Sequence, residues 1–532
     1  MRLLEMKLSY RTRSPGDAYV IAPPANCNFH RLLTGMVLSK CLARMPDYRE
    51  MPLRSRPTAM SRDFRSRPID RRTAVSILAA SMVAGCGDSG IKSTGTGTDD
   101  AASSAQPARS DVPLRILIAG SLLSGGRSAD GQSVAESIRV AWSMTQEQPL
   151  KIDVFDGPVS AGSVSDESAG ESHASDFATE MLLADVAIAP QSYLGEIRAQ
   201  DAAVRFNQEL LKDYQTRYGK PFPAVANGLG DYGGNTWGIA VGAKLPALLA
   251  LDSQVECDSW AAYHAWVEQL DGKAAEPLAR GWAGSSFLNR CASSFTRRWL
   301  FNRATMKPEI DSDDYVAALE QLAATAKLYP AAAMTPGQIW HAIRRGELAG
   351  GIGYEVPDAV NGAESDQRSE DGREEFEVSV FDCPRETETD QLWLGPQTPL
   401  ACLSSGCRQT SASKQFIGWL SGGERISTVR QQIGLFSQTR TAPGNDASPS
   451  GSPYSRWLAE RLQTLQVTRG LMLPGADRYY GALDRQVLRC LAGEQSAAEA
   501  LADAAAQWDT ITDELGRDQQ AVAWKRTLGF GG

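Results

Sequence analysis

Thiols and imidazoles are the groups of this chain that could bind a metal or form disulfides, and the sequence has nine cysteines and four histidines. Six of the cysteines follow residue 86, at Cys257, Cys291, Cys383, Cys402, Cys407 and Cys490. Cys402 and Cys407 are joined by Leu-Ser-Ser-Gly, which can turn the chain, so they are the disulfide candidate; buried free thiols are the alternative. No Cys-x-x-Cys pair occurs, so we expect no metal site and no cofactor.

Catalytic motifs typical of hydrolases would indicate enzyme activity. Gly87-Asp88-Ser89-Gly90 copies a string found in serine proteases, but nothing around it could orient a histidine. The chain beyond residue 86 has neither a Gly-x-Ser-x-Gly elbow nor a His-Glu-x-x-His motif. We therefore predict no catalytic residues and no enzyme activity. A glycoside hydrolase with paired carboxylates, tested through Asp156 or Glu355, is the catalytic alternative.

Cys86 ends a stretch that indicates export. Arg71-Arg72 is followed by a short run of small and apolar residues that closes with Val83-Ala84-Gly85-Cys86. A basic head, a short apolar core and a small-residue exit are the parts of a secretory signal peptide. The core is too short to span a bilayer, which needs ~20 residues. The exit resembles the cleavage box of bacterial lipoproteins, where the cysteine becomes lipidated; a buried helix ending in Gly-Cys is the alternative.

The charge of the chain changes once this leader is set aside. The first 85 residues hold 15 of the 54 basic and 6 of the 63 acidic residues, which leaves a formal net charge of −18. Such an acidic surface argues against nucleic acid or an anionic membrane surface as partners. Met60 begins a basic segment of ordinary length, so residues 1–59 are interpreted as a start-site artefact, or otherwise as a disordered extension. Residues 86–112 are rich in Gly, Ser and Thr and predict a flexible tether.

Buried strands alternate with helices after the tether. Short apolar runs at 114–120, 151–156 and 184–190 predict strands, and residues 132–144 and 194–204 predict helices between and after them. This alternation is typical of an α/β fold with a parallel sheet. Ligands of such sheets bind beyond the carboxyl ends of the strands. Polar candidates at these ends are Ser121, Asp156 and Gln191.

Several segments resemble, in order, the extracellular solute-binding proteins of ABC importers, the sugar-binding family. The resemblance covers roughly residues 114–529. Its pieces are the strand Arg115–Gly120, Trp237-Gly-Ile-Ala, the helix start Ser259-Trp-Ala-Ala-Tyr, Ile310-Asp-Ser-Asp-Asp-Tyr-Val-Ala-Ala-Leu-Glu, the segment from Trp340 through Arg345-Gly-Glu-Leu-Ala-Gly-Gly-Ile-Gly, and Ala498–Trp508. No piece is specific alone, whereas the ordered set behind a lipoprotein cleavage box is.

The resemblance implies two α/β lobes, each a mostly parallel sheet flanked by helices, joined by a hinge that closes on ligand. The expected organisation is a signal region (1–85), a tether (86–112), a first lobe (113–240 and 376–440) and a second lobe with C-terminal helices (241–375 and 441–532). The implied activity is capture of a small solute of the sugar class by a monomer that is anchored to the cell envelope through Cys86 and serves ABC permease subunits.

Sugar binding would use aromatic faces against pyranose rings and polar side chains on hydroxyls. The expected aromatic walls are Trp237, Trp282, Tyr354 and Trp393, and Glu355 joins the polar candidates at strand ends. A binding-protein fold that serves as a sensor or scaffold without transport is the alternative. The sequence leaves open the solute, and whether Arg71-Arg72, preceded by Asp70, directs export of a folded protein.

Overall fold

The computed structural model describes most of the chain after residue 110. The described residues are 111–123, 131–146, 148–155, 173–226, 228–292, 299–356, 375–386, 392–422, 430, 435–441, 451–463 and 467–530. Every described residue belongs to one compact unit, Ala102–Gly532. Cys86 and Asp156 lie outside the described residues.

Five strands form the first sheet, in the order β2-β1-β3-β12-β6. They are β1 (Leu114–Ala119), β2 (Leu150–Phe155), β3 (Val186–Pro190), β6 (Ile239–Ala240) and β12 (Pro399–Leu403). β1 runs parallel to β2 and β3, as the alternation of strands and helices predicts. β12 runs antiparallel to both β3 and β6, so the sheet is mixed. β3 is continuously apolar, and β1 is apolar except for Arg115, because both faces of the sheet are covered.

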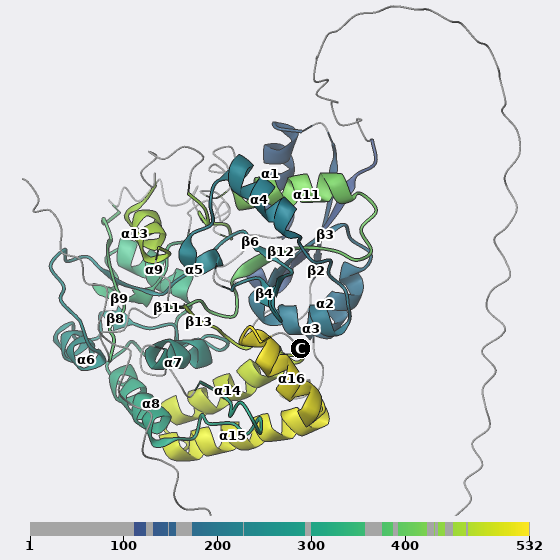
Figure 1. Ribbon diagram of the computed structural model, residues 1–532. Coiled ribbons are helices and arrows are strands. Elements are labelled where there is room, and N and C mark those ends of the chain that lie inside the picture. Colours follow the sequence, from purple (N-terminus) through teal and green to yellow (C-terminus); the bar gives the residue numbers. More distant parts are fainter. Residues whose placement is uncertain are drawn as a thin grey trace, which may run out of the picture. The chain divides into compact units, whose positions relative to one another are not determined.

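Helices cover this sheet on both sides (Figure 1). On one side lie α1 (Gly131–Ser143), α4 (Gln208–Tyr218) and α11 (Thr410–Ser421); on the other lie α2 (His173–Met181) and α3 (Leu194–Ala199). The Trp142 ring of α1 meets Phe416 and Trp419 of α11 edge-on, with ring centroids 5.2 and 5.1 Å away. Short elements complete this part: η1 (Gly120–Leu122), η2 (Gln191–Tyr193), α5 (Pro223–Ala226) and the hairpin of β4 (Asp231–Tyr232) and β5 (Asn235–Thr236).

The second sheet has the order β10-β7-β9-β8. Its strands are β7 (Ala247–Ala250), β8 (Ala274–Ala275), β9 (Gly350–Gly353) and β10 (Ser379–Phe381). Only β8 and β9 run parallel, so the expectation of a mostly parallel second sheet is wrong. β9 is rich in glycine because its neighbours approach closely: a Cβ on Gly351, whose φ is +156°, would lie 2.2 Å from the Ala275 carbonyl oxygen.

Four helices flank the second sheet: α6 (Trp260–Gln269), α7 (Ala283–Cys291), α8 (Asp313–Ala326) and α9 (Pro336–Arg344). The sequence predicts α6, α8 and α9 through their caps, since Ser259 and Thr335 accept hydrogen bonds from the first turns of α6 and α9. The position of β10 differs from the expected division of the chain into lobes. The range 376–440 was expected in the first lobe, but β10 pairs with β7 in the second sheet, and the return to the first sheet comes with β12.

Two stretches of chain connect the sheets. Residues 241–246 lead from β6 to β7, and residues 382–398 lead from β10 to β12. The second stretch contains β11 (Leu392–Trp393), which pairs in parallel with β13 (Val467–Thr468). The 241–246 connection is held by residues 435–441, because the Ser437 hydroxyl accepts from Ala243 N–H at 2.7 Å and donates to the Ala243 carbonyl at 2.8 Å.

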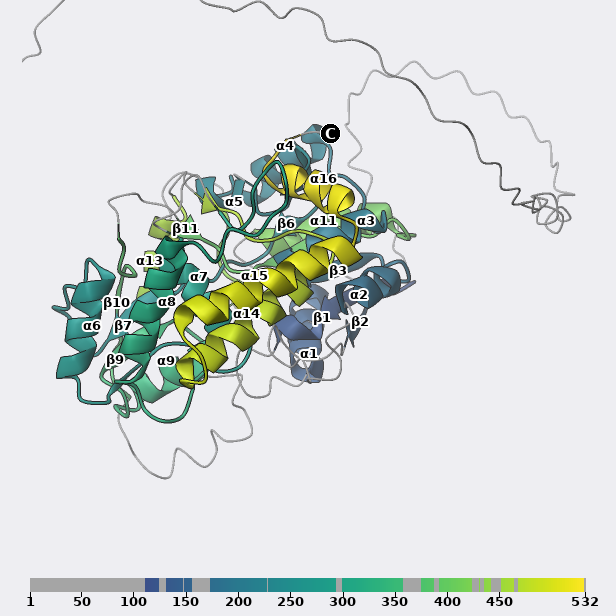
Figure 2. The same ribbon diagram turned by 90° about the horizontal axis from the view of Figure 1, so that it is seen from below.

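The C-terminal helices contact both groups of elements, although the sequence places them with the second lobe alone. They are α13 (Pro453–Arg461), α14 (Ala476–Leu491), α15 (Ala497–Glu514) and α16 (Arg517–Thr527). α14 packs on α7 and η2, α15 packs on α8, and α16 packs on β4. Figure 2 shows α14 and α15 running side by side. Among the described residues no helix is long and apolar enough to cross a membrane.

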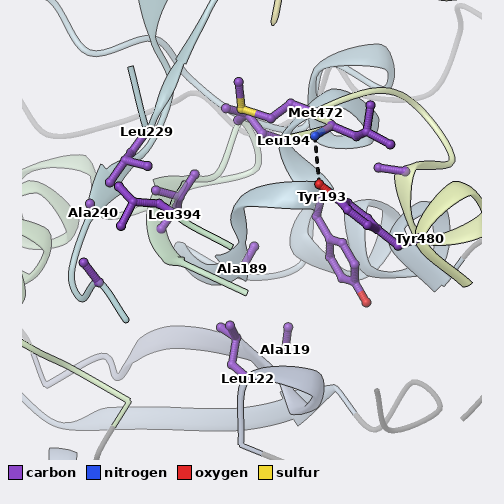
Figure 3. Packing of buried hydrophobic residues seen from close by; sticks show 14 of the residues in the cluster. Ala119, Leu122, Ala189, Tyr193, Leu194, Leu229, Ala240, Leu394, Met472 and Tyr480 are labelled. Carbon is purple, nitrogen blue, oxygen red and sulfur yellow. Dashed lines mark hydrogen bonds between the residues drawn. The ribbon is translucent and has the colours of Figure 1, made fainter. Parts of the chain in front are cut away.

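The larger of two hydrophobic clusters includes residues of both sheets and of the C-terminal helices, and the smaller one lies around α6. Figure 3 shows Met472 and Tyr480 packing toward Leu194 and Tyr193, which follow β3. The Leu471 N–H donates to the Tyr480 hydroxyl at 2.9 Å. Gly195 permits this approach, because a Cβ there would lie 2.2 Å from the Met472 carbonyl oxygen. The C-terminal tail is therefore part of the first lobe's packing.

Candidate ligand-binding site

A cavity of about 740 Å³, part of it open to solvent, lies where the two connections meet the second sheet. Its walls come from the 241–246 connection, α6, α7, β9 and the residues just before β12. The residues that line it and bear on function are Lys244, Trp260, Glu276, Trp282, Ser285, Ser286, Asn289, Tyr354, Trp393, Gln397 and Thr398.

The start of α7 supplies one wall. Gly281, at φ +86°, turns the chain into the helix, and Trp282 is the N-cap residue. The cap is completed from α14, because the Asp484 carboxylate accepts from Gly281 N–H at 2.7 Å and from Gly284 N–H at 2.9 Å. Burial raises the pKa of Asp484 to about 6, although these backbone hydrogen bonds act the other way. The half-buried Ser285 then lines the cavity from the first turn.

Aromatic side chains form most of the remaining lining. The Trp282 and Tyr354 rings lie 6.1 Å apart between centroids and 60° apart in plane. Tyr354 follows β9 directly, and Trp393 belongs to β11; both are buried, and burial raises the pKa of the Tyr354 hydroxyl. Trp260 adds a fourth ring from the start of α6. Such a lining offers flat apolar faces to a ligand.

Three buried polar atoms of the lining have no hydrogen-bond partner within the described part of the chain. They are Trp260 Nε1, Trp393 Nε1 and Gln397 Oε1. An unsatisfied buried polar atom costs about 1–3 kcal/mol, so proteins seldom keep several in one place. All three atoms belong to residues that line the cavity, so its wall contains polar groups that the described part of the chain leaves unpaired.

One charged pair and one single charge border the cavity. Glu276 is almost fully buried, and its carboxylate accepts from the equally buried Arg290 at 2.5 Å. The Arg290 guanidinium also lies 4.3 Å from the centre of the Trp260 ring. Lys244 is half-buried, with its Nζ 5.1 Å from the centre of the Tyr354 ring. Desolvation lowers the pKa of Lys244 to about 8.

Three of the sequence-predicted binding residues, Trp282, Tyr354 and Trp393, therefore line one cavity. Gln191 does not: it is buried, and its side-chain amide donates to the Leu229 carbonyl at 3.1 Å. Ser121 also lies elsewhere, in η1, where it hydrogen-bonds Tyr193. Both follow strands of the first sheet, as predicted, but the protein itself uses their polar atoms.

Trp237 and Glu355 also lie outside the cavity lining. The Trp237 ring is covered by the Arg198 guanidinium, 3.4 Å from the ring centre, and its Nε1 donates to the Tyr232 carbonyl. The Glu355 carboxylate accepts from Ser452 at 2.5 Å and from Ser455 at 3.3 Å, at the start of α13. Glu355 is thus a local partner of a helix N-terminus, which carboxylates stabilise.

Sequence reasoning missed the polar part of the lining: Lys244, Ser285, Asn289 and Gln397. Lys244 had a usable signal, because it is the only charged residue in the apolar run Ile239–Leu251. Ser285 and Asn289 share a face of α7 with Trp282, three and seven residues further on.

The predicted disulfide is not formed. Cys402 and Cys407 are both free thiols, as are the other described cysteines. Cys402 is buried on β12 against Gly238, whereas Cys407 lies past the end of that strand, with its Sγ 3.2 Å from the Ser413 hydroxyl. The described residues also hold no group of three or more His, Cys, Asp or Glu side chains placed to bind a metal ion.

No family model matches the sequence. No curated protein matches it either. Solved structures do match its fold. The sugar-binding protein MalE of Xanthomonas citri is 15% identical, with a TM-score of 0.54 over 76% of this chain and 98% of that one. An ABC transporter solute-binding protein of Agrobacterium radiobacter K84 in complex with ribitol is 12% identical, with a TM-score of 0.55 over 75% and 98%.

A third match is an ABC transporter solute-binding protein of Agrobacterium vitis S4 with bound D-mannitol. It is 14% identical, with a TM-score of 0.52 over 76% of this chain and 99% of that one. At such low identity the likeness concerns the fold. The chain has the two-lobed α/β fold of these binding proteins, as its ordered sequence segments predict.

Proposed function

We propose that this chain, which has the fold of ABC-transporter solute-binding proteins, captures a small hydroxylated solute, a sugar or a polyol, in the cavity beside its two connections. The observation that carries this proposal is the composition of that cavity lining. Four aromatic side chains line it, together with the polar Ser285, Asn289 and Gln397. Binding, not catalysis, is the proposed activity.

The lining residues divide the work between apolar and polar contacts. Trp282 and Tyr354 offer ring faces to the CH surfaces of a sugar or to the carbon chain of a polyol. Gln397, Asn289 and Ser285 offer donors and acceptors for hydroxyl groups. A site that hydrogen-bonds hydroxyls rejects analogues that lack them, because its own polar groups are then left unpaired.

The position of the cavity suits a solute that closes a hinge. Lys244 and Gln397 belong to the two connections, whereas Trp282 and Tyr354 belong to elements that flank or form the second sheet. A solute that contacts both groups favours whichever relative arrangement completes its contacts. Closure on ligand would in turn give an ABC permease a surface that differs between the empty and the loaded protein.

The sequence also indicates where the protein would act. The stretch Arg71–Cys86 would direct export, and lipidation of Cys86 would hold the protein at the outer face of a bacterial membrane through the tether 86–112. Cys86→Ser should release the protein into the soluble fraction of the envelope without changing solute affinity. A C86S protein that stays with the membrane would contradict the anchor.

Solute capture is tested by thermal unfolding and calorimetry with a panel of sugars, oligosaccharides and polyols. A ligand present at 100 times its Kd stabilises the folded state by about 2.7 kcal/mol, so a binder should raise Tm visibly. Trp282→Ala should weaken binding by about 10–100-fold, because its ring is a cavity wall. Trp237→Ala is the matched control: its ring packs under Arg198 outside the cavity, so its affinity should be unchanged.

Two results would contradict the proposal. The first is a panel in which no sugar or polyol stabilises the protein. The second is equal loss of affinity in the Trp282 and Trp237 variants, which would place the site elsewhere. If a solute binds but reconstituted permease hydrolyses ATP at the same rate with and without the loaded protein, a sensor or scaffold role replaces transport.

A further inference from the structure

Lys244 is the cavity residue whose presence a neutral sugar does not explain. It lies in the 241–246 connection, in an apolar run between two buried strands. Its ammonium group faces the Tyr354 ring at 5.1 Å, and no carboxylate in the described part of the chain pairs with it. Removing a lysine from water without a partner costs free energy, so an unrelated protein would rarely keep it there.

The other charge of the lining is already compensated. Glu276 is the only acidic residue among those that line the cavity, and it is bonded to Arg290, with both side chains almost fully buried. The cavity therefore carries one uncompensated positive charge. The ring of Tyr354 supplies a weak cation–π contact, which is worth far less than a carboxylate.

The unpaired hydrogen-bond donors of the lining favour an electron-rich ligand atom, as the positive charge of Lys244 does. Trp260 Nε1 and Trp393 Nε1 are buried N–H groups that have no acceptor among the described residues. An indole N–H donates and never accepts, so an acceptor atom brought within reach of either group would be favoured. Carboxylate oxygens are acceptor-only and form the stronger, charge-assisted kind of hydrogen bond.

We propose that the solute carries a single carboxylate that pairs with Lys244, so that the site takes an acidic sugar, such as a uronate or an aldonate, in preference to the neutral parent. One lysine suits a monoanion; phosphate esters are dianionic and are commonly held by arginine forks or several donors. The hydroxylated remainder of the ligand lies against Trp282 and Tyr354. This inference rests on the proposed function and narrows its substrate class.

The test compares matched pairs that differ in the acidic group. Calorimetry would measure D-glucuronate against D-glucose, and D-gluconate against D-glucitol, at fixed low ionic strength. The wild-type protein should bind the acid of at least one pair about 30-fold more tightly or better, as expected when one partner of a desolvated charge pair is missing. Raising the salt concentration should weaken binding of the acid and leave the neutral compound unaffected.

Lys244→Met removes the charge and keeps the aliphatic stem that packs beside Tyr354. It should reduce the preference for the acid to about threefold or less, whereas Lys244→Arg should keep most of it. Circular dichroism and thermal unfolding without ligand check that K244M folds. The wild-type preference and its salt dependence test the proposal without any variant.

The outcomes separate this inference from the proposed function. Binding of a neutral sugar or polyol as tight as that of its acid, or an unchanged acid preference in K244M, would overturn the charge pairing and leave solute capture standing. Failure of every acid and every neutral compound of the wider panel would overturn both.

Discussion

Asp185 beside the first sheet and Lys244 beside the second differ in how the fold satisfies their charges. At the first sheet, Asp185 is fully buried next to β3, and its carboxylate accepts from Arg115 Nε, an Arg115 terminal nitrogen and two backbone N–H groups, of Arg115 and Arg408. Beside the second sheet, Lys244 is removed from water with only the Tyr354 ring near it. A charge that the fold satisfies supports stability, whereas one that it leaves unsatisfied is better explained by a ligand.

The same contrast holds for uncharged polar groups. Gln191, at the end of a first-sheet strand, donates to a backbone carbonyl within the fold. Gln397, which lines the cavity, keeps an oxygen without a partner in the described residues. Position beyond a strand end therefore does not identify a binding residue. The contacts that the side chain makes in the folded protein have to be considered as well.

The largest effect is expected from Asp185→Ala. Removing this carboxylate leaves the Arg115 guanidinium and two backbone N–H groups without their acceptor, which should lower the free energy of unfolding by about 3–5 kcal/mol. Urea denaturation would measure this loss. Asp176→Ala is the control: Asp176 is exposed in the first turn of α2, and its loss should matter by no more than about 0.5 kcal/mol. If the free energy of unfolding of D185A fell by less than about 1 kcal/mol, the satisfied charge of Asp185 would not support stability as inferred.

Asp484→Ala should have the next largest effect. It removes the acceptor for two N–H groups at the start of α7, which should lower the free energy of unfolding by about 2–3 kcal/mol. Because α7 carries Trp282 and Ser285, solute affinity should fall as well. The exposed Asp503 of α15 offers the control, since Arg489 approaches it only to 3.7 Å. Unfolding measured with and without solute separates the two effects.

The pH dependence of stability distinguishes the satisfied charge directly. Desolvation raises the pKa of Asp185, but the hydrogen bonds from Arg115 and Arg408 outweigh it, and the net pKa is lowered. The carboxylate therefore stabilises the fold above its unfolded pKa of ~3.9, and this contribution is lost as pH falls further. The stability difference between wild type and Asp185→Asn should narrow below about pH 4. A stability difference that widened as the pH fell would mean that the pKa of Asp185 is raised in the folded protein, not lowered.

The smallest effect is expected from Lys244→Met, which should stabilise the protein where the other substitutions destabilise it. Without ligand the variant should be more stable than wild type at pH 7 by on the order of 1 kcal/mol, because a desolvated charge is gone. The folded pKa of Lys244, about 8, lies below the unfolded value of ~10.4, so wild-type stability should rise between these limits and close the gap. Tyr354 and the Glu276–Arg290 pair face the same cavity and are unchanged in both proteins. A less stable K244M would mean that the fold itself uses Lys244.

Local pattern predicted much of the first half of the fold. Short, largely apolar runs such as Leu114–Ala119 are typical of buried strands, and caps such as Thr335 mark helix starts. The mixed direction of the sheets was not predictable in this way. β12 pairs with β3, and β10 pairs with β7, across long stretches of sequence, and the pairing of distant segments leaves no local signature.

The binding residues were predictable only in part, for a related reason. Trp282, Tyr354 and Trp393 attracted notice as aromatic residues beside turns and strands, and the structure brings them to one cavity. Trp237 looked the same in sequence, but Arg198 covers its ring. Lys244 is the only charged residue of an apolar run, but the run alone does not say what surrounds its ammonium group. Which polar group is left unsatisfied depends on every neighbour in space, and the sequence does not present those neighbours together.

The C-terminal tail has a consequence for how the protein can fold. The N–H of Gly233, in the turn between β4 and β5, donates to the Arg526 carbonyl of α16 at 3.0 Å. Residues 471–473 pack on α3. The first lobe, which starts at Leu114, therefore cannot complete its packing until the last helix exists. Contacts between such distant residues form slowly, so an emerging chain stays open while it is made. A chain of this kind can be threaded through a membrane before it folds, and one truncated before Arg517 should fail in its first lobe as well as in its last helix.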